Sequence, residues 1–381
     1  MQKRLKPEPE HFEWLKSFEN QVQAKLYLAY LEARMGGKRK TVDEHNFELN
    51  ADHNLRALRK QIMNRTYRPG RSRAHIITKP VDREIFAASF PDRVIHHFLY
   101  DHVYEWWDKH FIEDSYSCRL RKGTKYGIER LDYHIRSASQ NYKKKVWVLK
   151  LDIQGYFMSL PRKKLYERAI WGLDQQFKDK KTQLYWLLKF LWRVIILDDP
   201  AKGAKKVGDL KAWKRIPACK SLFCQKPGIG IVIGNLTSQL LSNIYLDLLD
   251  RFVKFKLGYE HYGRYVDDFF IVVTEEQLPQ LKKDVLAIEK YLKTMGLTLH
   301  PKKRFLQESS KGVPFLGAIV YHNHILPGER VFKNAKQAFR EVEMGQRDLN
   351  TVVSYMGHVR YMQNVEFLRM CFETVGWEYN H

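Results

Sequence analysis

Residues 265–273 read Tyr-Val-Asp-Asp-Phe-Phe-Ile-Val-Val, and this stretch decides the fold. Two adjacent carboxylates stand between residues 259–264 and an apolar run. This order predicts a β-hairpin that presents Asp267 and Asp268 at its tip, above a buried strand. Adjacent negative charges repel, and a divalent cation is the usual partner that offsets the repulsion. An Asp-Asp pair alone is most often a solvated turn, so the metal interpretation needs support from elsewhere in the chain.

That support comes from Asp152, which ends the apolar segment Val-Trp-Val-Leu-Lys-Leu-Asp-Ile at 146–153, 115 residues before Asp267. An isolated strand-end aspartate is usually a cap or turn residue. Together with the acidic hairpin it predicts a site in which Asp152, Asp267 and Asp268 hold two metal ions roughly 4 Å apart for phosphoryl transfer. Hard cations also accept backbone oxygens, so the carbonyl of Ile153 is a further expected ligand.

The composition indicates a folded, basic protein. Hydrophobic residues make up 44% of the 381 positions, and 66 Lys and Arg against 43 acids give a net charge of +23. A large basic excess favours a polyanionic partner, above all nucleic acid, although a merely soluble basic protein stays open. Residues 201–229 hold eight Lys or Arg against one Asp and form either a phosphate-binding loop or a solvated connector.

Other functional classes receive little support. The four cysteines lack the pattern of a disulfide framework, and Cys219 and Cys224 form at most half of a zinc site. The N-terminus has no apolar signal core, and the most apolar stretch, 185–197, is interrupted by Lys189 and Arg193. We therefore expect a cytoplasmic protein without a membrane span.

Periodicity and punctuation predict the main elements. Helical spacing occurs at 11–35, 46–63, 94–107, 237–257 and 277–295, and residues 331–376 form a small helical region. Extended structure is expected at 74–90, 145–153 and 315–321.

These segments resemble the reverse transcriptases over most of the chain. Asp152 with Phe157 looks like the family's first catalytic motif, and Tyr265–Asp268 looks like its third. Residues 296–303 (GLTLHPKK) resemble the motif after the palm helix, and 315–317 (FLG) the primer-grip region. The resemblance implies an α+β right-hand polymerase fold. It places the fingers, with an N-terminal helical extension, at 1–145, a palm with an antiparallel sheet at 146–325 and a short helical thumb at 326–381.

One segment is similar to the reverse transcriptases of diversity-generating retroelements. Residues 233–239 read Ile-Gly-Asn-Leu-Thr-Ser-Gln, where most bacterial and retroviral members carry Gln-Gly, often followed by Ser-Pro. Residues 83–88 (REIFAA), 92–97 (DRVIHH) and 220–223 (KSLF) share the likeness, whereas Val232 stands where that subfamily has proline. The resemblance implies copying of a template-repeat RNA into cDNA with errors at adenines, and a small basic oligomeric accessory protein as partner.

The resemblance also assigns roles to single residues. Two Mg²⁺ ions are expected at Asp152, Ile153, Asp267 and Asp268. The expected nucleotide-binding residues are Lys79 and Arg83 at the triphosphate, Phe157 beneath the sugar, and Ile233, Gly234 and Gln239. Gly234 would allow close backbone approach to a template or nucleotide, and Ile233 removes a polar group that could hold the nucleotide. Lys302 and Lys303 are candidates for a general acid that protonates pyrophosphate, and either could instead bind the template.

Two alternatives stay open from the sequence. One is another bacterial reverse transcriptase, of the group II intron-like or phage-defence type. The other is an RNA-binding scaffold without polymerase activity, which the three intact acids oppose. In the enzyme interpretations the partners are template RNA, its cDNA and the four dNTPs.

Overall fold

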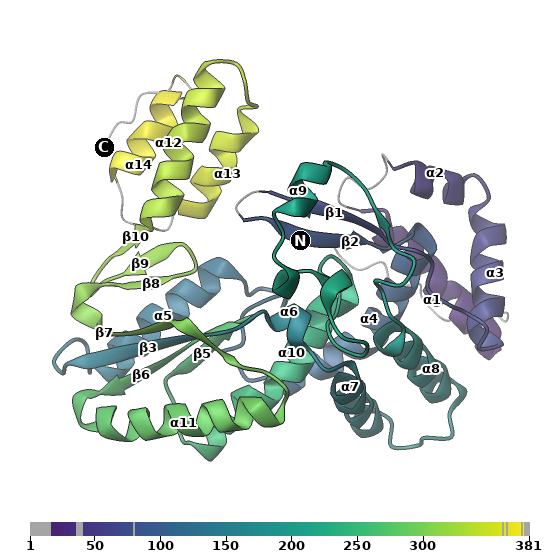
Figure 1. The fold of residues 1–381 in the computed structure, drawn as a ribbon, viewed down its shortest axis with the longest axis horizontal. Helices are drawn as coiled ribbons and strands as arrows, with labels where there is room; N and C mark the ends of the chain where they lie inside the picture. Colours follow the sequence, from purple (N-terminus) through teal and green to yellow (C-terminus); the bar gives the residue numbers. More distant parts are fainter. Residues whose placement is uncertain are drawn as a thin grey trace. The chain divides into compact units, whose positions relative to one another are not determined.

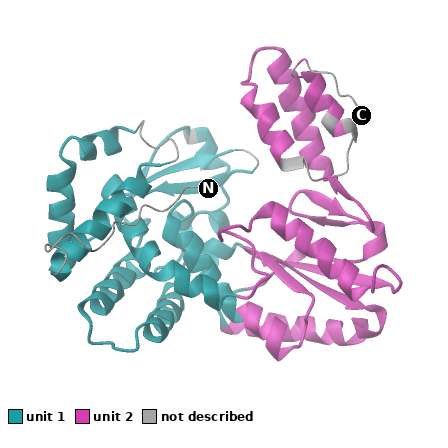
Figure 2. Cartoon of the chain, turned by 180° about the vertical axis from the view of Figure 1, so that it is seen from behind, with its two compact units in different colours: residues 1–111, 155–248, 295–297 teal, residues 112–154, 249–294, 298–381 magenta. Residues whose placement is uncertain are grey.

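The computed structural model describes residues 17–35, 41–78, 81–359, 362, 365–374 and 376. By its internal contacts the chain forms two compact units, which Figure 2 colours separately. Unit 1 contains residues 1–111, 155–248 and 295–297, and unit 2 contains residues 112–154, 249–294 and 298–381. The predicted division into fingers, palm and thumb follows contiguous segments and does not coincide with these units, because the chain passes between them several times. That division stays a prediction.

Unit 1 is mainly helical (Figure 1). Its helices are α1 (Phe18–Ala33), α2 (Val42–Glu48), α3 (Ala51–Met63), α4 (Phe90–His110), α6 (Tyr156–Ser159), α7 (Arg162–Gln176), α8 (Gln183–Leu197), α9 (Leu210–Lys214) and most of α10 (Leu236–Arg251). A three-stranded sheet has the order β2-β1-β4, formed by β2 (Arg83–Ala87), β1 (Arg73–Ile77) and β4 (Lys205–Lys206).

Local chemistry explains where the helices of unit 1 begin. The side chains of Ser17 and Ser89 accept hydrogen bonds from the backbone N–H groups at the starts of α1 and α4, and Pro91 occupies the first turn of α4. The helix predicted at 46–63 is two helices, α2 and α3, separated at Leu49 and Asn50. Asn50 stands at the N-cap position of α3 without a side-chain cap hydrogen bond, and asparagine is unfavourable inside a helix.

Unit 2 is built on a four-stranded antiparallel sheet with the order β5-β6-β3-β7. Its strands are β3 (Val146–Ile153), β5 (Tyr262–Tyr265), β6 (Asp268–Thr274) and β7 (Leu299–Glu308). Helix α5 (Thr124–Ala138) packs on β3, β5 and β6, and α11 (Leu278–Thr294) packs on β6. In Figure 1 these two helices lie on opposite sides of the sheet. Because both faces are covered, β6 is an unbroken apolar run rather than an alternating one.

The C-terminal part of unit 2 continues the same core. A second sheet has the order β10-β9-β8, formed by β8 (Val313–Phe315), β9 (Ala318–Val320) and β10 (Ile325–Pro327). Helices α12 (Glu329–Glu343), α13 (Asn350–Val359) and α14 (Val365–Thr374) follow. Phe315 of β8, Ile128 of α5 and Phe339 of α12 belong to one buried cluster. This sheet and the three helices are therefore anchored on the face of the first sheet that carries α5.

Two sequence predictions in this region needed correction. The strand predicted at 315–321 is the hairpin β8–β9, because Leu316 and Gly317 turn the chain with φ of 49° and 84°. The helix predicted at 237–257 ends as α10 at Arg251 and continues as a short π-helical turn at Phe252–Lys256. Among the described residues, no helix combines the length and the apolar content that a membrane crossing requires.

Candidate active site

The acidic hairpin has the predicted form. Strands β5 and β6 pair antiparallel with Tyr265 opposite Asp268, which leaves Val266 and Asp267 as the two-residue turn. Val266 has a φ of 54°, a region that a β-branched residue rarely occupies. The turn therefore holds a strained residue directly before the first carboxylate.

The register of the sheet brings the third acid to this hairpin. Strand β3 pairs with β6 so that Asp152 lies opposite Asp268. The backbone N–H of Ile153 donates a hydrogen bond to the carbonyl of Asp267 at 3.1 Å. Asp152, more than a hundred residues before Asp267 and Asp268 in the chain, thus meets them at one end of the sheet.

The surroundings disfavour the ionised form of two of these acids. Burial raises the pKa of Asp267 to about 6, and the negative charge of Asp152 adds to the rise. Burial also raises the pKa of Asp268 to about 6, where Lys150 opposes the rise and Asp152 adds to it. Partly buried, mutually repelling carboxylates of this kind are poised to accept a cation.

Two lysines supply positive charge at the same place. The Nζ of Lys303, on β7, lies 2.8 Å from Oδ2 of Asp152, and the Nζ of Lys150, on β3, lies 3.8 Å from Oδ2 of Asp268. Lys302 is exposed, and its backbone N–H donates to Nδ1 of His300. Lys303 is exposed as well, and both lysines lie where the register of β7 against β3 shifts, between the pairs Leu151–Arg304 and Ile153–Leu299.

Metal binding here would require an adjustment of the side chains. Within the described residues, no three His, Cys, Asp or Glu side chains already converge on one cation position. Mg²⁺ is commonly held by one or two carboxylates together with water and substrate phosphates, so the donor chemistry of Asp152, Asp267 and Asp268 fits it. A cation would replace Lys303 as the partner of Asp152. The four cysteines are free, and Cys219 and Cys224 are exposed.

The residues expected to bind nucleotide lie in unit 1. Phe157 and Ile233 both pack, half-buried, on a small cluster that contains Phe86 of β2. The backbone N–H of Phe86 donates to the carbonyl of Ile233 at 2.9 Å, which ties the 231–235 loop to β2. Arg83 begins β2 and Gln239 lies in α10, and both are exposed. Lys79 lies outside the described residues.

Gly234 has a structural requirement of its own. Its φ is +125°, and a Cβ at this position would lie 2.7 Å from the carbonyl oxygen of Phe86. The sequence suggested that the absence of a side chain serves a template or nucleotide. In the structure, the close approach that requires glycine is to the backbone of β2.

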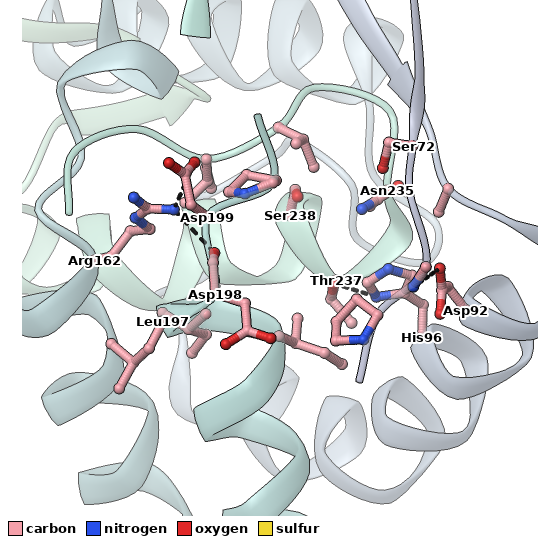
Figure 3. Close-up of a pocket in the computed structure, with 18 of the residues that line it drawn as sticks. Ser72, Asp92, His96, Arg162, Leu197, Asp198, Asp199, Asn235, Thr237 and Ser238 are labelled. Carbon is pink, nitrogen blue, oxygen red and sulfur yellow. Dashed lines mark hydrogen bonds and ion pairs between the residues drawn. The ribbon is translucent and has the colours of Figure 1, made fainter. Parts of the chain in front are cut away.

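The opposite side of the same loop lines a cavity of about 460 Å³ that the sequence did not indicate. Val232, Asn235 and Ser238 contribute to its wall, whereas Ile233 and Gly234 do not. Figure 3 shows Arg162 reaching Asp198 and Asp199 in one part of the wall, and Thr237 beside His96 in another.

Two polar groups on α4 stabilise this wall. Asp92 is buried and accepts hydrogen bonds from the Tyr67 hydroxyl at 2.6 Å, the Ser89 hydroxyl at 2.6 Å and the Gly70 N–H at 2.9 Å. Nδ1 of His96 lies 2.8 Å from Oγ1 of Thr237, and burial lowers the pKa of this histidine to about 3, so it is neutral at physiological pH. The network fixes α4 against the loop before β1 and against α10.

Comparisons with known proteins agree on the fold. Residues 82–320 match the family model described as reverse transcriptase (RNA-dependent DNA polymerase). Similar solved structures include telomerase from Candida albicans and telomerase from Candida tropicalis, each in complex with a TWJ fragment of telomeric RNA. Both are 13% identical to this chain at a TM-score of 0.50, and they cover 84% and 80% of it.

The chain spans 58% and 53% of the length of those two telomerase chains. At such low identity the likeness shows a shared fold alone. No curated protein sequence matches the chain.

Proposed function

The chain belongs to the reverse transcriptase family, and on that premise we propose that it is an RNA-dependent DNA polymerase that copies template RNA into cDNA. The observation that carries the proposal is the sheet register that sets Asp152 opposite Asp268, with Asp267 in the adjoining turn. Three carboxylates at one sheet end suit phosphoryl transfer, in which catalysis depends on positioning and on offsetting negative charge.

Asp152, Asp267 and Asp268, with the carbonyl of Ile153, are the proposed ligands of two Mg²⁺ ions. When bound, such ions activate the primer 3′-hydroxyl and stabilise the departing pyrophosphate. The raised pKa values of Asp267 and Asp268 support this assignment, since they reflect burial and repulsion that a cation would offset.

Lys303 is the better of the two candidates for the general acid. Its ammonium group already lies within hydrogen-bond distance of Asp152, whereas Lys302 donates its backbone N–H to His300. A protonated Lys303 would donate its proton to the leaving pyrophosphate, and its contact with Asp152 would keep the side chain at the acidic end of the sheet until a cation takes its place.

The remaining residues would bind the nucleotide and the nucleic acid. Arg83 and Lys79 are proposed to contact the triphosphate, where a guanidinium can make paired hydrogen bonds. Phe157 would pack against the sugar, and Gln239 belongs to the same nucleotide-binding set. The net charge of +23 suits contacts to the phosphates of template RNA and cDNA.

Within the family, we assign the chain to the diversity-generating retroelement type. The support is the sequence Ile233-Gly234-Asn235-Leu236-Thr237-Ser238-Gln239 together with the similar segments at 83–88 and 92–97. The proposed product is cDNA of a template-repeat RNA with errors at adenines. A small basic oligomeric accessory protein is the proposed partner.

The infidelity is attributed in part to Ile233, which packs on the cluster of Phe86 through carbon atoms alone. An Ile233→Gln variant should lower the error rate at template adenines, because an amide restores a group able to hold the nucleotide by hydrogen bonds. The measurement is sequencing of cDNA made on an adenine-containing RNA. Leu286→Gln, an exposed leucine of α11, is the matched control and should keep the wild-type spectrum. An unchanged adenine error rate in Ile233→Gln refutes this role.

The proposed function is tested by cDNA synthesis on a primed RNA with Mg²⁺ and all four dNTPs, followed by sequencing of the product. Synthesis with errors concentrated opposite adenines is the expected result. Faithful cDNA would keep the polymerase and refute the retroelement type. If no cDNA forms either alone or with the accessory protein, while RNA is still bound, the chain is an RNA-binding scaffold and the proposal fails.

A further inference from the structure

A buried ion pair lies beneath the acidic hairpin. The side chains of Arg264, in β5, and Asp250, in the last turn of α10, are both fully buried. Nε and Nη2 of Arg264 each lie 2.7 Å from one carboxylate oxygen of Asp250, and the hydroxyl of Tyr262 donates to the same carboxylate at 2.6 Å. This paired geometry fixes the plane of the guanidinium.

The guanidinium has further donors, and these reach two other segments. Nη1 donates to the carbonyl of Val266 at 3.1 Å, and Nη2 donates to the hydroxyl of Ser115 at 3.1 Å. The backbone of Arg264 also bonds to Asp114 and Tyr116, which lie on either side of Ser115. One side chain therefore joins α10, the segment 114–116 and the turn of the hairpin.

The contact with Val266 falls on the strained residue of the turn. Val266 has a φ of 54°, and such a conformation persists only where its surroundings hold it. The peptide of Val266 is bonded to Arg264, and the next carbonyl, that of Asp267, accepts the N–H of Ile153. The carboxylates of Asp267 and Asp268 follow directly from this fixed turn.

We propose that Arg264, anchored by Asp250, is a positioning residue that sets the Val266–Asp267 turn and thereby the placement of the two hairpin carboxylates for metal binding. The inference rests on the proposed function. A buried ion pair needed for folding alone is often replaceable by apolar residues. This pair differs from an ordinary core pair because Nη1 of Arg264 also donates to the Val266 carbonyl in the hairpin turn.

The test compares Arg264→Lys with Arg168→Lys. Arg168 of α7 forms a similar pair with Asp247 of α10, with its Nη2 2.6 Å from Oδ2, and its guanidinium lies over the rings of Trp107 and Trp171. Lysine keeps the charge in both variants. In Arg264→Lys, however, the single nitrogen of lysine cannot replace the two nitrogens that contact Asp250 and the third that donates to Val266. Thermal unfolding first establishes how far each variant is destabilised.

The deciding readout is Mn²⁺ affinity without substrate, measured by electron paramagnetic resonance, together with kcat and KM for dNTP at saturating Mg²⁺. Arg264→Lys should weaken Mn²⁺ binding by about tenfold or more and lower kcat more than it raises KM. Arg168→Lys should keep the wild-type Mn²⁺ affinity. Wild-type affinity in Arg264→Lys refutes the proposal, whatever its melting temperature.

Should Arg264→Lys fail to fold, Asp250→Asn answers the same question. Asparagine keeps the shape and one acceptor oxygen, so the guanidinium is held less firmly, and weaker Mn²⁺ binding is expected. Unchanged Mn²⁺ affinity in a folded Asp250→Asn protein refutes the proposal. A wild-type protein that neither binds Mn²⁺ nor synthesises cDNA would refute the proposed function rather than the positioning role of Arg264.

Discussion

At the residue scale, the candidate active site holds carboxylates whose negative charge is only partly offset by nearby lysines. Asp267 and Asp268 each have a pKa raised to about 6, mainly by burial, and Lys150 and Lys303 offset the charge only in part. Burial and repulsion of these acids are therefore expected to lower the stability of the metal-free fold, an effect that is common at active sites.

Replacement of Asp267 by asparagine tests this imbalance. An unfolded aspartate has a pKa of about 3.9, so between about pH 4 and pH 6 the folded protein keeps a proton that the unfolded chain has released. The free energy of unfolding therefore falls as pH rises through this window, and the destabilisation is complete above it. At pH 7 the metal-free Asp267→Asn protein should be more stable than the wild type by about 1–2 kcal/mol.

The measurement is urea unfolding with and without Mg²⁺. Mg²⁺ should stabilise the wild type and have little effect on Asp267→Asn. Asp284→Asn serves as the control, because this buried carboxylate accepts the Tyr259 hydroxyl at 2.7 Å and is not one of the proposed metal ligands. It should gain no stability and should keep the Mg²⁺ response. A destabilised Asp267→Asn protein would show that repulsion among the acids is unimportant.

Lys303 provides a second test at this scale. Loss of a general acid typically lowers the rate by about 10²-fold or more, so Lys303→Gln should show such a loss in the single-turnover rate of nucleotide addition. Lys302→Gln, one residue away, should keep the rate. Equal effects of the two substitutions would assign both lysines to nucleic-acid binding.

At the element scale, the sequence predicted the elements well where periodicity is strong. The hairpin, the strand at 145–153, and the helices at α4 and α11 all lie where their patterns placed them.

Strand β7 was not predicted, because its basic and largely exposed residues do not alternate. The pairing of Asp152 with Asp268 depends on the register between distant strands, which no local pattern contains. Arg264 was missed because one charged residue in a short strand resembles a solvent-facing position.

The contact between Gly234 and β2 gives a prediction at this scale. Gly234→Ala combines a positive φ with a Cβ only 2.7 Å from the Phe86 carbonyl, so it should lower the free energy of unfolding by about 3 kcal/mol or more. Gly228→Ala has a φ of +81° but nothing near its Cβ, and backbone strain alone should cost about 1 kcal/mol. Urea unfolding measures both. Equal losses would mean that the approach to β2 does not constrain residue 234.

At the scale of the whole molecule, one sheet end in unit 2 carries the acids, and unit 1 carries the loop and strand assigned to the nucleotide. The family match over residues 82–320 includes both sets. The net charge of +23 favours a nucleic-acid partner, because a strongly basic chain associates readily with nucleic acid. This association depends on the salt concentration. We propose that the chain copies RNA into DNA.

The most direct test of that claim is extension of a DNA primer on an RNA template with Mg²⁺ and dNTPs, comparing the wild type with Asp267→Asn. Binding of the primed template is measured in parallel. We expect the wild type to extend the primer, and Asp267→Asn to bind the template as tightly but to extend it at least about 10³-fold more slowly. Extension by Asp267→Asn at the wild-type rate would contradict the assignment of the acids. No extension by the wild type on any primed RNA, with or without an accessory protein, would contradict the polymerase itself.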